Sequence, residues 1–107
     1  MKKKLLIIGA GGHGRCCFDI ANRMNRYDMI HFLDDNSNDN YVVGKINDLS
    51  KFKNDYDEVF IAIGNNQMRY QLIKKCKEIN LTVTTLIDPM SFISPESIIE
   101  EGTVIFP

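Results

Sequence analysis

Residues 9–14, with the sequence GAGGHG, have the spacing of a phosphate-binding loop. They directly follow the apolar run of residues 5–8, where a buried strand would turn sharply into a helix. Glycine suits this turn because it permits a tight bend, a close approach of the backbone to a phosphate, and close packing of helix on strand. The helix that follows would direct free N–H groups and the positive end of its dipole at the loop, which favours an anion. The spacing therefore predicts a site for a nucleotide-like diphosphate that includes Gly9, Gly11, Gly12, His13 and Gly14.

Two aspartates stand where a strand–helix–strand unit of this kind places a ribose-binding acid. Asp34 lies 20 residues beyond Gly14, and Asp35 follows it, at the end of the apolar run of residues 29–33. A carboxylate at this position can accept hydrogen bonds from a ribose. Neighbours on an extended chain point to opposite faces, so we expect one aspartate on the ligand and the other in a cap or in solvent.

A third polar segment follows the apolar run of residues 58–63 and consists of Gly64, Asn65 and Asn66. Either asparagine is a natural N-cap for the next helix, a role that needs no ligand. Arg69 lies one turn into that helix and can reach a phosphate or remain on the surface. Because ligands of open parallel sheets bind at the carboxyl ends of the strands, we expect all three segments to converge on one crevice.

The elements that must position these residues alternate between strands and helices. Between the strands at residues 5–8 and 29–33, a helical stripe is formed by Cys17, Ile20, Ala21 and Met24. After the strand at 58–63, a second stripe consists of Met68, Leu72, Cys76 and Ile79. Another strand is expected at 81–87, a short edge strand at 42–43, and a capped turn with a weak helix near 47–49. This alternation predicts an α/β, Rossmann-like parallel sheet with right-handed crossovers.

The last residues depart from this alternation. Ile93, Ile99 and Ile105 recur with a period of six, which is typical of a parallel β-helix. An irregular final strand is the alternative. We therefore interpret residues 1–89 as the Rossmann-like domain and residues 90–107 as the first coils of a hexapeptide-repeat β-helix, in a chain that is a piece of a longer protein.

Composition excludes several classes of function. With 107 residues, 44% hydrophobic and 25% charged, the chain has the make-up of one globular domain. A net charge of −1 provides no field to attract nucleic acid or an anionic membrane, and no apolar stretch approaches transmembrane length. Three cysteines without metal-ligand spacing predict free thiols in the cytoplasm and no metal site.

Five segments together resemble the bacterial sugar O- and N-acyltransferases, which include sialic acid O-acetyltransferases and UDP-amino-sugar N-acetyltransferases. These segments are GAGGHG at 9–14, FLDD at 32–35, AIGNN at 62–66 with Arg69 beyond it, ISP at 93–95 and EGTVI at 101–105. The resemblance implies an amino-terminal domain that holds a nucleotide sugar. It also implies a left-handed β-helix that follows, trimerises, binds acetyl-CoA and carries the histidine general base.

The resemblance also assigns roles to residues of this chain. Gly11, Gly12, His13 and Gly14 would contact the diphosphate or the sugar of a UDP-sugar. Asp34 and Asp35 would hold the uridine end, while Gly64, Asn65 and Asn66 would line the pocket. The acetyl-CoA site and the catalytic histidine would lie in coils beyond residue 107. We therefore expect this chain to bind its ligand without turning it over, and we assign no catalytic residue to it.

Two other functions are compatible with the residues. The glycine spacing and the acidic residue also suit NAD(P), as in an oxidoreductase or a redox sensor. However, the length leaves no room for a second mononucleotide-binding half or a catalytic domain. The chain could also be a non-catalytic module that binds nothing tightly. Binding of a UDP-sugar, of NAD, or of neither separates these three functions.

Overall fold

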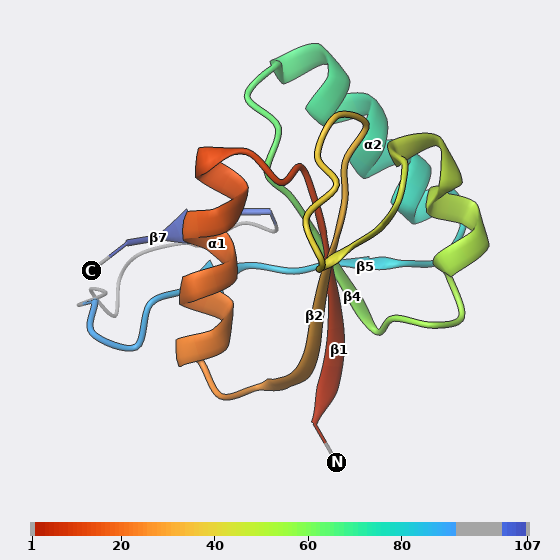
Figure 1. The fold of residues 1–107 in the computed structure, drawn as a ribbon. Helices are drawn as coiled ribbons and strands as arrows, with labels where there is room; N and C mark the ends of the chain where they lie inside the picture. Colours follow the sequence, from red (N-terminus) through yellow and green to blue (C-terminus); the bar gives the residue numbers. More distant parts are fainter. Residues whose placement is uncertain (1, 92–101, 107) are drawn as a thin grey trace.

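A computed structural model of the chain describes residues 2–91 and 102–106. Five strands form one parallel sheet in the order β3-β2-β1-β4-β5 (Figure 1). In chain order the elements of this part are β1 (Lys3–Ile8), α1 (Gly12–Arg23), β2 (Tyr27–Leu33), β3 (Val42–Gly44), the 3-10 helix η1 (Ile46–Phe52), β4 (Glu58–Ile61), α2 (Asn66–Glu78) and β5 (Thr82–Val83). The predicted α/β, Rossmann-like parallel sheet is confirmed.

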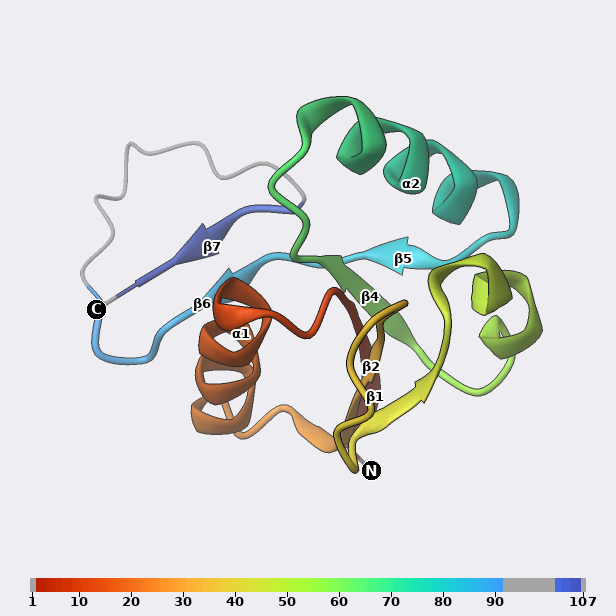
Figure 2. The same cartoon turned by 45° about the horizontal axis from the view of Figure 1, so that its top comes forward.

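The sheet has helices on both faces. α1 covers one face, and η1 and α2 cover the other (Figure 2). Residues 5–8 of β1 are all fully buried, and they alternate between the two sides. Leu5 and Ile7 join the core beneath α1, whereas Leu6 and Ile8 join the core beneath α2 and η1. A central parallel strand is buried on both faces, which is why its sequence is a continuous apolar run.

The first predicted helical stripe is confirmed and the second is partly wrong. Cys17, Ile20 and Ala21 are buried on α1 as expected. On α2, Met68 is 45% exposed, although it was expected to face the core. The apolar side chains of α2 that pack on the sheet begin at Leu72, so the helix meets the sheet only after its first turn.

The strand expected at residues 81–87 is two strands in two sheets. β5 pairs with β4 in the main sheet, whereas β6 (Leu86–Ile87) pairs in parallel with β7 (Val104–Ile105). Two backbone hydrogen bonds explain why the chain changes its pairing partner after β5. The Leu86 N–H donates to Thr103 O at 2.8 Å, and the Gly102 N–H donates to Thr84 O at 3.1 Å. The strand prediction missed this because the new partner lies much later in the chain.

The β6–β7 pair lies at the edge of the α1 core. Leu86 is buried in that core, and Val104 packs against it. Arg23 at the end of α1 forms an ion pair with Asp88, whose side chain is buried. β7 pairs with residues that precede it by 18 positions, which equals three six-residue repeats. Ile93 and Ile99 lie outside the described residues, so the division into residues 1–89 and 90–107 stays a prediction.

The amino end of the sheet is closed by a polar cluster around Glu58. This side chain is 3% exposed. Its carboxylate accepts hydrogen bonds from the Tyr27 hydroxyl at 2.6 Å and from Arg26 Nη2 at 2.5 Å, and it lies 3.4 Å from Lys3 Nζ. Burial by itself raises the pKa of Glu58, but hydrogen bonds from Arg26, Tyr27 and Thr84 outweigh it and lower the pKa from 4.5 to about 2.

Candidate functional site

Two glycines of the loop between β1 and α1 are required by packing. Gly9 has φ +107°, in the region that favours glycine, and a Cβ there would lie 2.8 Å from Ala62 O. A Cβ on Gly14 would lie only 1.9 Å from Gly9 O, because the first turn of α1 rests on the loop. The Gly9 N–H is already used, since it donates to Leu33 O at 2.8 Å. Both positions therefore require glycine for packing, and Gly9 has no free N–H group to offer a ligand.

The other two glycines of the loop face open space. A Cβ on Gly11 or on Gly12 would meet no atom within 4 Å. Gly11 is the N-cap of α1, no side chain caps the helix, and its first turn holds no acidic residue. The first helical hydrogen bond runs from Arg15 N–H to Gly11 O at 3.0 Å. The N–H groups of residues 12–14 thus have no acceptor in the described part of the chain, an arrangement suited to an anion.

Asp34 holds this loop in place through the backbone. Its Oδ2 accepts from the Ala10 N–H at 2.7 Å, and its Oδ1 accepts from the N–H groups of Asn36 and Ser37, both at 2.8 Å. The Ala10 hydrogen bond is the main reason that the pKa of Asp34 lies below its usual value. The side chain thereby ties the glycine loop to the end of β2, a role that the sequence did not reveal.

Asp35 also forms hydrogen bonds with other residues of the chain. Its Oδ1 accepts from the Ile46 N–H at 3.0 Å, and its backbone oxygen accepts from Lys45 Nζ at 3.0 Å. Asp35 therefore fixes the start of η1 to the end of β2. A contact of either aspartate with a ribose stays a prediction.

The turn between β4 and α2 lies beside the glycine loop, because β1 and β4 are neighbouring parallel strands. Asn65 Oδ1 accepts from the Met68 N–H at 2.9 Å, which confirms it as the N-cap of α2. Asn66 is the first residue of that helix, and a Cβ on Gly64 would meet open space. Arg69 Nη2 donates to Gly102 O at 2.8 Å, so it ties α2 to the C-terminal segment.

A pocket of about 310 Å³ lies between these two turns. It brings together three of the predicted residues, since His13, Gly64 and Arg69 all line it. The remaining lining residues are Phe60, Ile61, Ile63, Gly102, Thr103 and Val104. Residues 102–104 were not expected in the site. The EGTVI motif to which they belong was the available signal in the sequence, and by itself it indicates only part of a β-helix.

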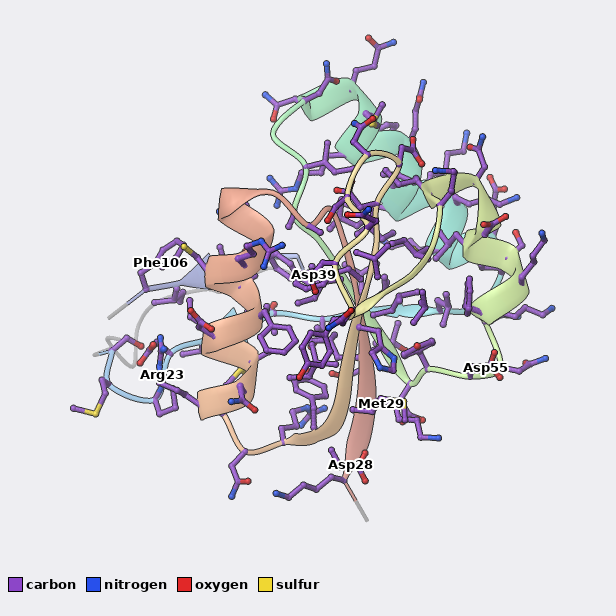
Figure 3. All side chains as sticks on the ribbon, viewed as in Figure 1. Arg23, Asp28, Met29, Asp39, Asp55 and Phe106 are labelled. Atoms are coloured by element: carbon purple, nitrogen blue, oxygen red, sulfur yellow. The ribbon has the colours of Figure 1, made fainter. Side chains whose placement is uncertain are left out.

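The C-terminal segment also contacts His13. The rings of His13 and Phe106 lie with their centroids 6.2 Å apart, and Phe106 lies beside α1 (Figure 3). The other histidine, His31, forms a hydrogen bond of 2.6 Å between its Nδ1 and the Tyr56 hydroxyl, and burial lowers its pKa. His31 has the structural role that was expected for it.

All three cysteines are free thiols, as predicted. Burial raises the pKa of Cys17 to about 12 and that of Cys76 to about 11, so neither is a reactive thiolate. Among residues 2–91 and 102–106, no cluster of three or more histidine, cysteine or acidic side chains is arranged to hold a metal ion. No helix within the same residues is long and apolar enough to cross a membrane.

Comparison with known protein families shows to which family this chain belongs. Residues 4–76 match the PglD N-terminal domain family. The chain belongs to this family. The curated UDP-N-acetylbacillosamine N-acetyltransferase of Bacillus subtilis (strain 168) is 29% identical over 110 residues, covering 96% of this chain and 51% of that protein. The chain thus spans about half the length of this relative.

Solved structures agree with this assignment to the PglD N-terminal domain family. The acetyltransferase domain of PglB from Neisseria gonorrhoeae FA1090, in complex with acetyl coenzyme A, is 32% identical with a TM-score of 0.86. The match covers 97% of this chain and 53% of that one. PerB from Caulobacter crescentus, in complex with CoA and GDP-perosamine, is 24% identical with a TM-score of 0.84, covering 95% and 50%. The PerB likeness shows the fold alone. The Bacillus relative and the PglB domain are acetyltransferases and give no support to the NAD(P) alternative.

Proposed function

We propose that this chain is the nucleotide-sugar-binding domain of an acetyl-CoA-dependent sugar N- or O-acetyltransferase. The observation that carries the proposal is the open start of α1 at residues 11–14, beside the pocket of His13, Gly64 and Arg69. Membership of the PglD N-terminal domain family and the N-acetyltransferase activity of the Bacillus relative support the same function.

The diphosphate would lie at the start of α1. There the N–H groups of residues 12–14 would donate to phosphate oxygens, and the helix dipole would favour the negative charge. The absence of a side chain at Gly12 leaves room for this approach. His13 would donate to a phosphate or to the sugar from the same turn.

The sugar would occupy the neighbouring pocket. Its walls combine apolar side chains from the end of β4 with polar groups from α2 and residues 102–104. Arg69 uses one donor on Gly102 O, and an arginine carries four more N–H groups. The C-terminal segment thus forms part of the wall that orients the sugar.

In the intact enzyme, acetyl-CoA would supply the acyl group as a thioester. The task of this chain is to hold the accepting amine or hydroxyl of the sugar in a fixed orientation toward that thioester. From the resemblance we further propose UDP as the nucleotide, residues 90–107 as the first coils of a left-handed β-helix, and a homotrimer as the assembly of the intact enzyme.

Calorimetric titration of the chain with UDP, a UDP-amino-sugar and NAD tests the proposal. We expect the UDP-amino-sugar to bind at least as tightly as UDP, because the sugar adds contacts in the pocket, and NAD to bind much more weakly. Tighter binding of NAD would favour the oxidoreductase alternative. Absence of binding by all three ligands would contradict a nucleotide-sugar domain.

A further inference from the structure

Residues 102–104 form part of the wall of the pocket proposed for the sugar, together with His13 and Gly64. Unlike those two residues, they do not follow a strand of the main sheet. They lead into β7, which pairs with β6 in a separate small sheet. The pocket therefore keeps its shape only while this segment is held against the main sheet and α2, and the contacts that hold it set the orientation of a bound sugar.

Backbone hydrogen bonds attach the segment to the chain between β5 and β6. The Gly102 N–H donates to Thr84 O at 3.1 Å, and Thr103 O accepts from the Leu86 N–H at 2.8 Å. Gly102 is buried and has φ +76°, in the region that favours glycine. The segment thus enters β7 through a tight turn, and these two bonds fix it along one side.

A side chain supplies a third contact, from α2. Arg69 Nη2 donates to Gly102 O at 2.8 Å, and the Arg69 side chain is half-buried. The place of Arg69 on the helix is itself fixed, because its N–H donates to Asn65 O at 2.9 Å in the capped first turn. A hydrogen bond from a guanidinium is stronger than one between two neutral groups. Arg69 therefore joins the start of α2 firmly to the segment that forms the pocket wall.

We propose that Arg69 is a positioning residue for the sugar, which it orients by holding residues 102–104 in the pocket, and that it is not a ligand of the phosphates. The inference rests on the proposed function, because it takes the sugar pocket from it. The donors for the phosphates are the N–H groups of residues 12–14, at the start of a different helix. The Arg69 guanidinium is held instead at the backbone oxygen of Gly102.

The two roles of Arg69 predict different dependences on the ligand. An arginine that contacts the phosphates would strengthen the binding of pyrophosphate, of UDP and of a UDP-sugar alike, because all three carry a diphosphate. An arginine that holds the wall would strengthen binding only when a sugar is present, because the sugar is the part of the ligand that contacts residues 102–104. A comparison of ligands with and without a sugar therefore separates the two roles.

The test is a calorimetric titration of the whole chain and two variants with inorganic pyrophosphate, UDP and a UDP-amino-sugar. Arg69→Met removes the guanidinium and keeps a long, unbranched side chain that suits a helix. Arg23→Gln is the matched control. Arg23 forms an ion pair with Asp88, which follows β6 at the other end of the β6–β7 pair, and it does not line the sugar pocket. Circular dichroism and urea denaturation check the fold of each variant.

We expect Arg69→Met to weaken binding of the UDP-amino-sugar by at least about fivefold, and to leave the affinities for UDP and pyrophosphate within about twofold of the wild type. Arg23→Gln should lower stability and leave all three affinities within the same limit. In an amide-resolved NMR spectrum of unliganded Arg69→Met, the largest shifts outside α2 should occur at residues 102–104.

Three results would overturn the inference while the proposed function stands. The first is an equal loss of UDP and UDP-amino-sugar affinity in Arg69→Met, which would make Arg69 a phosphate ligand. The second is an unchanged affinity of that variant for the UDP-amino-sugar. The third is an equal loss of UDP-amino-sugar affinity in Arg23→Gln, which would assign the effect to the general stability of the β6–β7 pair. If the wild type binds neither UDP nor the UDP-amino-sugar, the proposed function and the inference both fail.

Discussion

Two turns of this molecule occupy equivalent places and end differently. In both, a buried parallel strand leads into a helix at the same edge of the sheet. At the start of α2, Asn65 caps the helix with its own side chain. At the start of α1 the equivalent position is Gly11, and no side chain accepts from the first N–H groups of that helix in the described part of the chain.

This difference indicates which of the two turns suits a ligand. A helix start normally receives a cap, because unsatisfied N–H groups cost free energy. α2 follows this rule within the protein, whereas α1 leaves its donors open and places glycines around them. An external anion satisfies the donors of α1 without competing with a side chain. We therefore propose the glycine-rich turn as the phosphate site, whereas the asparagine turn contributes Gly64 to the wall of the pocket.

The largest expected effect is a loss of stability at a glycine that packing requires, compared with a glycine that faces open space. Gly14→Ala would place a methyl group 1.9 Å from Gly9 O, and a backbone atom cannot move aside cheaply. We expect a loss of about 3 kcal/mol in the free energy of unfolding, measured by urea denaturation. Gly12→Ala is the control, because its methyl group meets nothing within 4 Å, and it should retain wild-type stability. Equal losses in both variants would contradict this distinction.

The other end of the sheet provides a pH-dependent marker of folding that is independent of both turns. The pKa of Glu58 is about 2 in the folded chain against 4.5 ordinarily, so its carboxylate stabilises the fold above pH 4.5. This contribution, roughly 3 kcal/mol, is lost as the pH falls from about 5 toward 2. Urea denaturation across this range should show a steeper decline in the wild type than in Glu58→Gln, in which Asp34 still contributes to the decline. An unchanged slope in the variant would assign the decline to other carboxylates.

Gly12→Val tests the open turn directly. The valine side chain would project into the space proposed for the phosphates, and it meets no protein atom near its Cβ. We expect UDP affinity to fall at least about tenfold, equivalent to about 1.4 kcal/mol, with little change in unfolding. Calorimetry and urea denaturation of the same preparation measure both quantities. Unchanged affinity would remove the glycine loop from the binding site.

The smallest effect concerns the capped turn. Asn65→Ala removes the acceptor of the Met68 N–H and should lower the free energy of unfolding by about 1 kcal/mol. Nucleotide affinity should stay within twofold of the wild type, because the cap and the phosphate site belong to different helices. A loss of binding as large as that of Gly12→Val would show that both turns hold the ligand.

Local sequence was enough to predict the elements around the glycine loop. Residues 5–8 form a continuous apolar run because β1 is buried on both faces, and Cys17, Ile20 and Ala21 share the buried side of α1. Each of these patterns depends on near neighbours along the chain. The parallel order of the sheet then followed from the alternation of strands and helices.

Features that depend on distant partners escaped sequence reasoning. The strand at 81–87 divides because Leu86 and Ile87 pair with Val104 and Ile105, which lie 18 residues later. Asp34 was expected near a ribose, but its role in holding Ala10 depends on where the chain folds back. Residues 102–104 line the pocket because the pairing of β6 with β7 joins segments that lie far apart in the sequence. A sequence shows which groups can bond, and only the fold shows which of them meet.

An amide-resolved NMR titration of the ¹⁵N-labelled chain with UDP tests most directly whether the uncapped start of α1 is the phosphate site. We expect the largest shifts at the backbone amides of residues 11–14, whereas those of Asn66 and Gln67 at the start of α2 should change little. Shifts centred on the start of α2, with the glycine loop unaffected, would contradict the claim that the uncapped helix is the phosphate site.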